Sequence, residues 1–464
     1  MFLTHYLVFA AVSVMLFPLA PPRWAAAAIC LGGWLLLPIG HLAYAPSEET
    51  FFTFWITGVG LPGWTRVSKF WVAPVTALLA ALVWDRGTLA RFRPGFLDVA
   101  MLAWCLWPLA QAAVVGRADP PGWISSLYLF GSWGASWLLG RTYFGDGEGR
   151  SALIGAMAMS ALLLAPIAII EGLGRPQAYA WLYHLHPFRA DGVERYVGFR
   201  PVAFFEHGNQ YGVWIAAAAV AAVAWAQGPS GIAIRLARVA LAVGAVAVAV
   251  AGQSVGALCL MLAALALLAV RGVPFLAFLV PPVLLSVVIA AGWYVSGGAL
   301  EAMIARPELG QAVAELVGAY DRQSLIWRMH HDEDARQVIA HHFWVGSATA
   351  DPVAWEGKQR PWGFILLAAG QAGVIGVALA IVALTAPALR ILLNPARYRG
   401  GGGQAIVLGL AAIVLVGVGD MLFNSFILYP AIAAAGAIAR RRTVASPVAE
   451  DENRAAEHRI GAPA

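Results

Sequence analysis

Polar residues that could bind an anion or move a proton cluster at the start of one apolar stretch. Arg200, Glu206, His207 and Asn209 stand close together, and an almost unbroken apolar run follows them. An ionisable cluster at the end of a membrane helix is energetically costly and is a functional-site hypothesis by default. Interfacial anchoring is the alternative, because arginines and aromatic residues also collect at membrane boundaries.

A second polar segment covers residues 321–360, and a helix is predicted from Asp321 to about residue 342. Within it, Arg328, Asp332 and Arg336 are spaced at i, i+4 and i+8, so they share one helix face. A surface ladder of ion pairs, worth about 0.3–0.5 kcal/mol per pair, is the alternative interpretation of this spacing.

Almost every cation is an arginine, since only Lys69 and Lys358 are lysines among 30 basic residues. A planar guanidinium suits paired contacts to phosphate or carboxylate oxygens, although a GC-rich genome would produce the same bias. The histidine pairs at 330–331 and 341–342 raise the question of a metal site, but adjacent helix residues point to different faces, so no metal is predicted. No glycine-rich phosphate loop is present, and no cofactor or nucleic-acid partner is expected.

The composition indicates an integral membrane protein. Of the 464 residues, 60% are hydrophobic and 12% are charged, against about 45–50% and about 25% in soluble domains. The first apolar stretch lacks the charged start of a cleaved signal peptide, so it is predicted to be a membrane span. The three cysteines all lie in apolar runs, which predicts no disulfide framework.

A span requires about 20 apolar residues, and this length predicts an all-α polytopic fold with about 12–13 transmembrane helices. The predicted spans are 4–20, 25–42, 70–84, 97–115, 123–139, 153–172, 210–226, 236–252, 254–270, 275–295, 364–388, 405–419 and 421–438.

Arginines in the short loops fall consistently on one side, which the positive-inside rule makes cytoplasmic. The N-terminus is then outside and the C-terminus is cytoplasmic. Four regions follow from this orientation. They are transmembrane helices over 1–295 with an external loop near 173–209, a large external loop with helices over 296–363, transmembrane helices over 364–438, and a disordered cytoplasmic tail over 439–464.

Four loose patterns follow one another between about residue 190 and residue 380. They are Arg200…Asn209, Gln253-Ser-Val-Gly256, Arg328…Phe343-Trp-Val-Gly346 and Gly370-Gln-Ala-Gly373. In their order and spacing, the chain resembles the O-antigen ligase and polymerase superfamily of bacterial inner-membrane glycosyltransferases. The resemblance implies a fold like that of the C-type glycosyltransferases, in the bacterial inner membrane.

The resemblance also implies a reaction: transfer of a glycan from an undecaprenyl diphosphate-linked donor to an acceptor hydroxyl at the outer face of the membrane. Arginines would hold the diphosphate, since they bind phosphate oxygens in pairs, and a histidine or carboxylate would accept the hydroxyl proton. Under this interpretation the substrate-binding residues are Arg200, Arg328, Asn209, Arg322, Arg360 and Trp362, and the catalytic candidates are Asp332, His207, Glu206 and His331.

One position departs from the family pattern. The family usually has a histidine just before the span that carries Gly-x-x-Gly, and here Trp362 is nearest to that position. The group that activates the acceptor is therefore expected to differ, which favours an exopolysaccharide or O-antigen polymerase slightly over a ligase.

Two other functions stay open: a transporter or flippase of lipid-linked sugars, and a non-catalytic assembly subunit of a polysaccharide export system. A transporter should carry ionisable residues in broken helices near mid-membrane, whereas Asp98, Glu171 and Asp420 stand near predicted span ends. The expected partners are the lipid-linked donor, a glycan or lipid acceptor, membrane lipids, and other polysaccharide assembly or export proteins.

Overall fold

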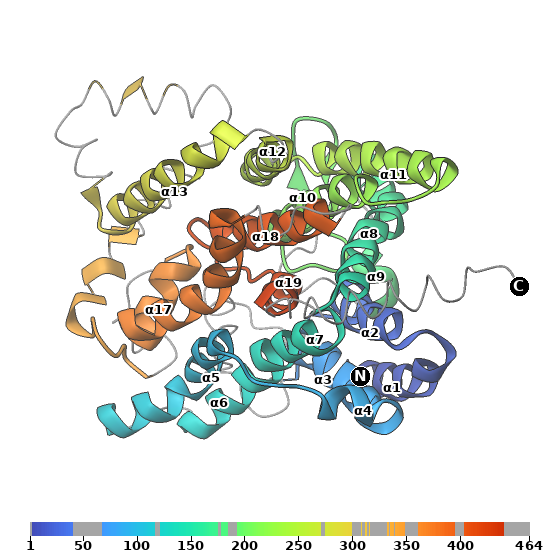
Figure 1. The fold of residues 1–464 in the computed structure, drawn as a ribbon. Helices are drawn as coiled ribbons and strands as arrows, with labels where there is room; N and C mark the ends of the chain where they lie inside the picture. The colour runs from blue at the N-terminus through green and yellow to red at the C-terminus, as the bar shows by residue number, and fades with distance from the viewer. Residues whose placement is uncertain are drawn as a thin grey trace, which may run out of the picture.

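The protein is a bundle of helices in a computed structural model (Figure 1). The structure describes residues 2–39, 67–116, 121–174, 178–183, 193–270, 274–298, 308, 311, 312, 315, 332–333, 335–337, 339–348, 361–394 and 403–439. Four of the predicted site residues lie outside the described residues, namely Arg322, Arg328, His331 and Arg360. The predicted tail, apart from its first residue, lies outside them as well.

The helices up to residue 183 are α1 (Phe2–Leu16), η1 (Phe17–Leu19), α2 (Pro22–Leu36), α3 (Lys69–Trp84), α4 (Arg86–Ala90), α5 (Phe96–Val115), α6 (Gly122–Leu129), the π-helical η4 (Phe130–Gly134), α7 (Ala135–Tyr143), α8 (Gly147–Leu173) and α9 (Ala178–Tyr183). A short antiparallel hairpin follows, with β1 (Val193–Glu194) paired to β2 (Phe199–Arg200). The later helices are α10 (Gly208–Ala226), α11 (Ile232–Ala251), α12 (Val255–Val270), α13 (Pro274–Val295), α17 (Phe364–Leu393), α18 (Gly403–Asp420) and α19 (Tyr429–Ala439).

The predicted helical membrane fold is confirmed. Five helices within the described part of the chain, α5, α8, α11, α17 and α18, are long and apolar enough to cross a membrane. Shorter apolar helices accompany them, including α3, α12 and α19. Apart from α19, the bounds of these helices lie within six residues of the predicted spans. A run of apolar residues long enough to cross a bilayer is a local property of the sequence.

The predicted span 421–438 is wrong in its first half. Residues 421–428 are not helical, and α19 begins only at Tyr429. The backbone of this 421–428 segment is partly satisfied by protein, since the N–H of Phe364 donates to the oxygen of Asn424 at 3.1 Å. Irregular backbone at membrane depth is tolerated where protein buries it. Apolar composition alone does not separate such a segment from a span.

α10 forms the centre of the bundle. Almost all of its side chains are buried, and it packs against α8, α11, α12 and α18 (Figure 1). An alanine-rich stretch over 216–222 lets these neighbours approach closely, as small residues do between membrane helices. At its N-terminal end, a Cβ on Gly212 would lie 2.4 Å from the Cβ of Ser254. Close packing on every side therefore fixes the start of α10.

α17 is broken at Gly373, which has a φ of +68°. Gly346, with a φ of +79°, lies against the break, and a Cβ there would come within 2.4 Å of the Gly373 nitrogen. Side chains of α5 supply hydrogen bonds at the break: Trp107 donates to the oxygen of Ala372 at 2.7 Å, and Gln111 donates to two further backbone oxygens. The pattern that ends at Gly346 and the pattern that ends at Gly373 therefore pack directly against each other.

Candidate functional site

A chain of side-chain hydrogen bonds leads from Arg200 into the bundle. Arg200 donates to the Asn209 amide oxygen at 2.5 Å, the Asn209 amide nitrogen donates to Asn424 at 3.1 Å, and Asn424 donates to Asp420 at 2.6 Å. A guanidinium only donates hydrogen bonds and an ionised carboxylate only accepts them. Arg200 at one end and Asp420 at the other therefore fix which way the side-chain amides of Asn209 and Asn424 point. We call this chain the Arg200–Asp420 network.

Two local features hold Arg200 at the mouth of α10. Arg200 is the last residue of β2. In the turn of the same hairpin, Val197 donates its N–H to the Gln253 side-chain oxygen at 3.1 Å, and the Gln253 side-chain nitrogen donates to the Val197 backbone oxygen at 2.7 Å. The Arg200 stem lies across Gly208, where a Cβ would come within 2.7 Å of the Arg200 Cδ. The glycine between His207 and Asn209 therefore makes room for the arginine.

Glu171, near the end of α8, organises the loop that follows Arg200. Its carboxylate accepts hydrogen bonds from the backbone N–H groups of Val202 and Ala203, each at 2.8 Å, and from that of Ala178 at 2.7 Å. Ala203 has a φ of +51°, an uncommon conformation for a residue with a side chain. The buried carboxylate thus satisfies backbone groups of a tight turn, which is a positioning role.

His207 caps α10. Its Nδ1 accepts a hydrogen bond from the N–H of Asn209 at 3.1 Å, and its ring stacks on Phe426 with centroids 5.6 Å apart. Because Nδ1 is the acceptor, a neutral His207 carries its proton on Nε2. In that state Nε2 is a donor, so it suits stabilising an oxyanion better than removing a proton.

Glu206 lies in the interior, only 2% exposed, rather than at an open surface. Burial raises the pKa of its carboxyl to about 8, and the charge of nearby Lys69 limits this rise. Lys69 donates to the oxygen of Phe204 at 2.7 Å and lies 5.1 Å from the ring centres of Trp34 and Phe205. The buried Glu206 and Lys69 stabilise the loop and offer no open face to an acceptor.

Asp332 is also buried, with 1% exposure, and it accepts a hydrogen bond from the Tyr294 hydroxyl at 3.0 Å. Arg336, expected to share a face with it, instead donates to Glu333 and to the backbone oxygens of Val295 and Tyr294 at the end of α13. Of the two interpretations of this spacing, the ladder is not supported at its Asp332–Arg336 step, because the ion pair of Arg336 within the described part of the chain is with Glu333. Arg336 caps α13 instead.

The 421–428 segment brings these predicted residues together. Asn424 bonds Asn209, and Phe426 stacks on His207. On its other side, Phe423 packs edge-on against Tyr294, the partner of Asp332, with ring centroids 5.4 Å apart.

Trp362 lies next to a glycine that contacts the same segment. It stands just before the Gly363 cap, and a Cβ on that glycine would lie 2.5 Å from the oxygen of Leu422. Residues from both predicted external loops thus meet around one short segment.

Asn424, Asp420 and Glu171 were not among the site residues predicted from the sequence. Asp420 and Asn424 are four residues apart in an otherwise apolar stretch, and a carboxylate with an amide in such a setting is a signal of a functional or structural polar site. The expectation of a continuous span over 421–438 concealed this signal.

Within the described part of the chain, no group of three or more His, Cys, Asp or Glu side chains is arranged to hold a metal ion. Comparison with models of protein families gives no match, and no curated protein matches the sequence.

Proposed function

We propose that this protein transfers a glycan from an undecaprenyl diphosphate-linked donor to an acceptor hydroxyl, as an exopolysaccharide or O-antigen polymerase or ligase. The reaction would occur at the outer face of the bacterial inner membrane. The protein would have about 12–13 transmembrane helices, in a fold like that of the C-type glycosyltransferases. The N-terminus would lie outside and the C-terminus in the cytoplasm.

The observation that carries this proposal is the Arg200–Asp420 network. A buried guanidinium oriented by an amide, at the start of a helix, is suited to oxyanion binding. The first N–H groups of α10 add to the attraction, because helix N-termini favour anions. The resemblance to the O-antigen ligase and polymerase superfamily supports the same assignment, since Arg200 and Asn209 carry its first pattern.

The proposed reaction breaks the bond between the anomeric carbon and the diphosphate oxygen, and the electron pair leaves with that oxygen. Arg200 stabilises the negative charge that develops there, and preorganised contacts of this kind usually contribute more to catalysis than any other effect. The acceptor hydroxyl oxygen forms the new bond to the anomeric carbon. Its proton passes to a base. The sequence favours Asp332 for this role, but its carboxylate is as buried as that of Glu206 and accepts from Tyr294, so substrate binding must open its surroundings first. His207 serves as an oxyanion donor.

A transporter or flippase of lipid-linked sugars is the second candidate, and two observations favour it. α17 is broken at Gly373, and Glu171 and Lys69 are buried ionisable residues. Broken helices and intramembrane charges are features of transporters. However, both ionisable groups bond to backbone atoms of the loop before α10, which is a structural use of their charge.

Replacing Arg200 tests the enzyme proposal. We expect Arg200→Ala to insert at normal levels and to lose about 10²–10³ in product formation, since an unpaired developing charge costs about that much. Arg200→Lys should restore little, because it lacks the planar fork. The readouts are polymer yield and mass spectrometry of lipid-linked glycans, with exposed Arg235→Ala on α11 as the matched control.

The site of donor accumulation separates the two candidates. Under the enzyme proposal, the unreacted donor accumulates at the outer leaflet, where an impermeant glycan-oxidising reagent labels it in spheroplasts. Labelling only after lysis would indicate a transporter. Near-normal product from Arg200→Ala would overturn both the site and the proposed reaction.

A further inference from the structure

A cavity of about 1360 Å³ lies at the opposite, arginine-rich side of the bundle, away from the mouth of α10. Segments from the start of α2, α4, the start of α5 and the end of α7 surround it. The arginines that line it are Arg23, Arg91, Arg93, Arg141 and Arg390, and the carboxylates are Asp85, Asp98 and Asp146.

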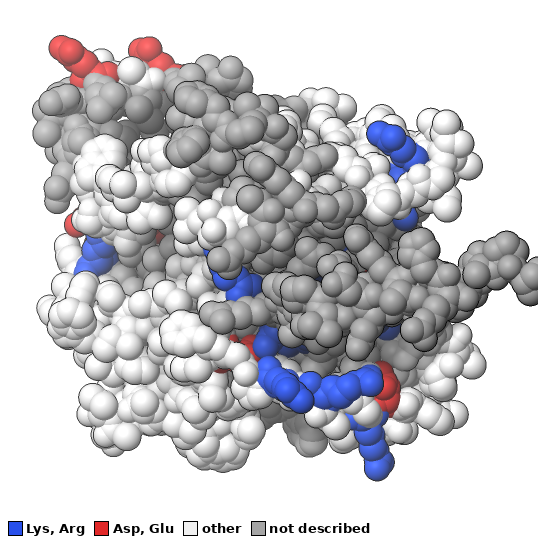
Figure 2. Space-filling view, viewed as in Figure 1, with Lys and Arg blue, Asp and Glu red and all other residues white. Residues whose placement is uncertain are grey.

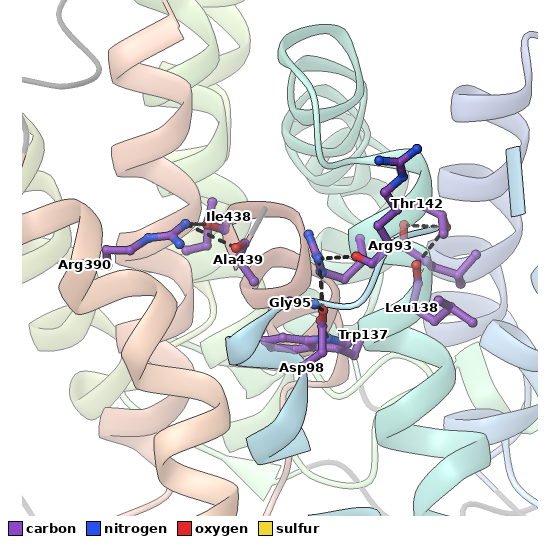
Figure 3. Close-up of polar contacts among 11 residues, drawn as sticks. Arg93, Gly95, Asp98, Trp137, Leu138, Thr142, Arg390, Ile438 and Ala439 are labelled. Carbon is purple, nitrogen blue, oxygen red and sulfur yellow. Dashed lines mark hydrogen bonds and ion pairs between the residues drawn. The ribbon is translucent and has the colours of Figure 1, made fainter. Parts of the chain in front are cut away.

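The carboxylates of this cavity are already engaged. Asp98 accepts from Arg141 at 2.7 Å, Asp146 accepts from Arg23 at 2.7 Å, and Asp85 accepts from a tyrosine hydroxyl at 3.0 Å. Arg390 is held from the other side, where it donates to the backbone oxygens that end α19 (Figure 3). Most of the cavity's charge is thereby fixed within the protein.

Arg91 and Arg93 differ from the other three. Both are exposed, and neither forms an ion pair with another described residue. Arg91 donates to the Thr88 hydroxyl at 3.0 Å, and the Arg93 side chain extends away from Asp98 (Figure 3). Figure 2 shows basic side chains gathered where Figure 1 places α4. These two guanidinium groups give the cavity an excess of positive charge.

An apolar slot of about 260 Å³ adjoins this cavity. Its walls are the side chains of Val75, Leu78, Leu79, Leu82, Leu89, Phe92 and Leu138. Phe92 lines both spaces, and α4 contributes residues to each. A hydrocarbon chain lying in the slot would therefore place a linked headgroup beside Arg91 and Arg93.

We propose that this cavity and slot bind an anionic phospholipid, with the headgroup phosphate at Arg91 and Arg93 and one acyl chain in the slot. Guanidinium groups bind phosphate oxygens in pairs, and basic pockets between membrane helices take anionic headgroups. The positive-inside rule accounts for arginines on this side, but it does not account for an apolar slot that continues from them. The inference is independent of the glycan-transfer proposal.

Native mass spectrometry of the full-length protein in detergent tests this site. Phosphatidylglycerol and phosphatidylcholine with the same acyl chains are titrated separately, and the phosphatidylglycerol adduct should dominate. The double variant Arg91→Gln/Arg93→Gln should bind phosphatidylglycerol about tenfold more weakly, because it loses charge-assisted hydrogen bonds to phosphate. Arg235→Gln, an exposed arginine that does not line the cavity, should leave binding unchanged.

A second variant tests the slot. Leu79 is exposed and lines the slot, so Leu79→Trp should fold normally and obstruct the acyl chain. It should weaken binding of long-chain phosphatidylglycerol and leave the short dihexanoyl lipid unaffected. Equal binding of the two headgroups, or wild-type binding by the double arginine variant, would overturn the headgroup site. Unchanged long-chain binding in Leu79→Trp would overturn the acyl slot.

Discussion

The two ends of the molecule hold buried arginines in different ways. At the mouth of α10, Arg200 donates to the neutral amide of Asn209, and the carboxylate of Asp420 stands two hydrogen bonds further on. At the arginine-rich cavity, Arg141 bonds both oxygens of Asp98 directly, at 2.7 and 3.0 Å.

The difference separates two uses of a guanidinium. A direct pair with a carboxylate neutralises the cation locally, so Arg141 is suited to holding α5 against α7. An amide orients a guanidinium without neutralising its charge, so the contact with Asn209 is compatible with anion binding by Arg200. The same residue type is therefore a structural brace at one end and a candidate binding group at the other.

The largest effect on stability is expected from breaking the ion pair between Arg141 and Asp98. Arg141→Ala should destabilise the protein by about 3 kcal/mol, because the largely buried Asp98 carboxylate would lose its ion-pair partner and keep only neutral donors such as Trp137 and Gly95. The double variant Asp98→Leu/Arg141→Leu should recover much of this loss, since apolar replacement of a buried pair is often neutral. Unfolding in detergent measures both variants, with exposed Arg235→Ala, outside the cavity, as the control. A single-variant loss below about 1 kcal/mol would place this pair with weak surface ion pairs.

An intermediate effect is expected from interrupting the Arg200–Asp420 network. Asn424→Ala removes the link that orients Asn209, so we expect about 1–3 kcal/mol of destabilisation from buried groups that lose a partner. Product formation should fall further than stability explains, because Arg200 loses its indirect support. Asn394→Ala, at the exposed end of α17, is the matched control. Wild-type product from Asn424→Ala would show that the network does not position Arg200.

The last prediction concerns pH. The pKa of Glu206 is raised to about 8 from an ordinary 4.5, so the folded state holds an extra proton between these values. Folded stability is then lost as pH rises through this window, because the unfolded state binds fewer protons. The unfolding midpoint should fall as pH is raised through this range, and Glu206→Gln should flatten the decline. Exposed Glu194→Gln should retain it. An unchanged slope in Glu206→Gln would assign the dependence to another group.

Much of the fold followed from local sequence. The predicted span 97–115 corresponds to α5, and 210–226 to α10, because a long apolar run requires neither its neighbours nor its packing to be known. Arg200 and Asn209 were also identified locally, since both stand where a polar loop enters an apolar run. Their contact in the structure joins residues only nine positions apart.

The features that could not be predicted from the sequence depend on contacts between distant parts of the chain. Asn424 meets Asn209 across 215 positions of sequence, and its non-helical segment is hydrogen-bonded by residues of both α10 and α17. The burial of Glu206 beside Lys69 is equally non-local. Local hydrophobicity determined which segments enter the membrane. Only tertiary packing decided which polar groups inside it became partners, because a buried donor must find its acceptor wherever the fold brings one within reach.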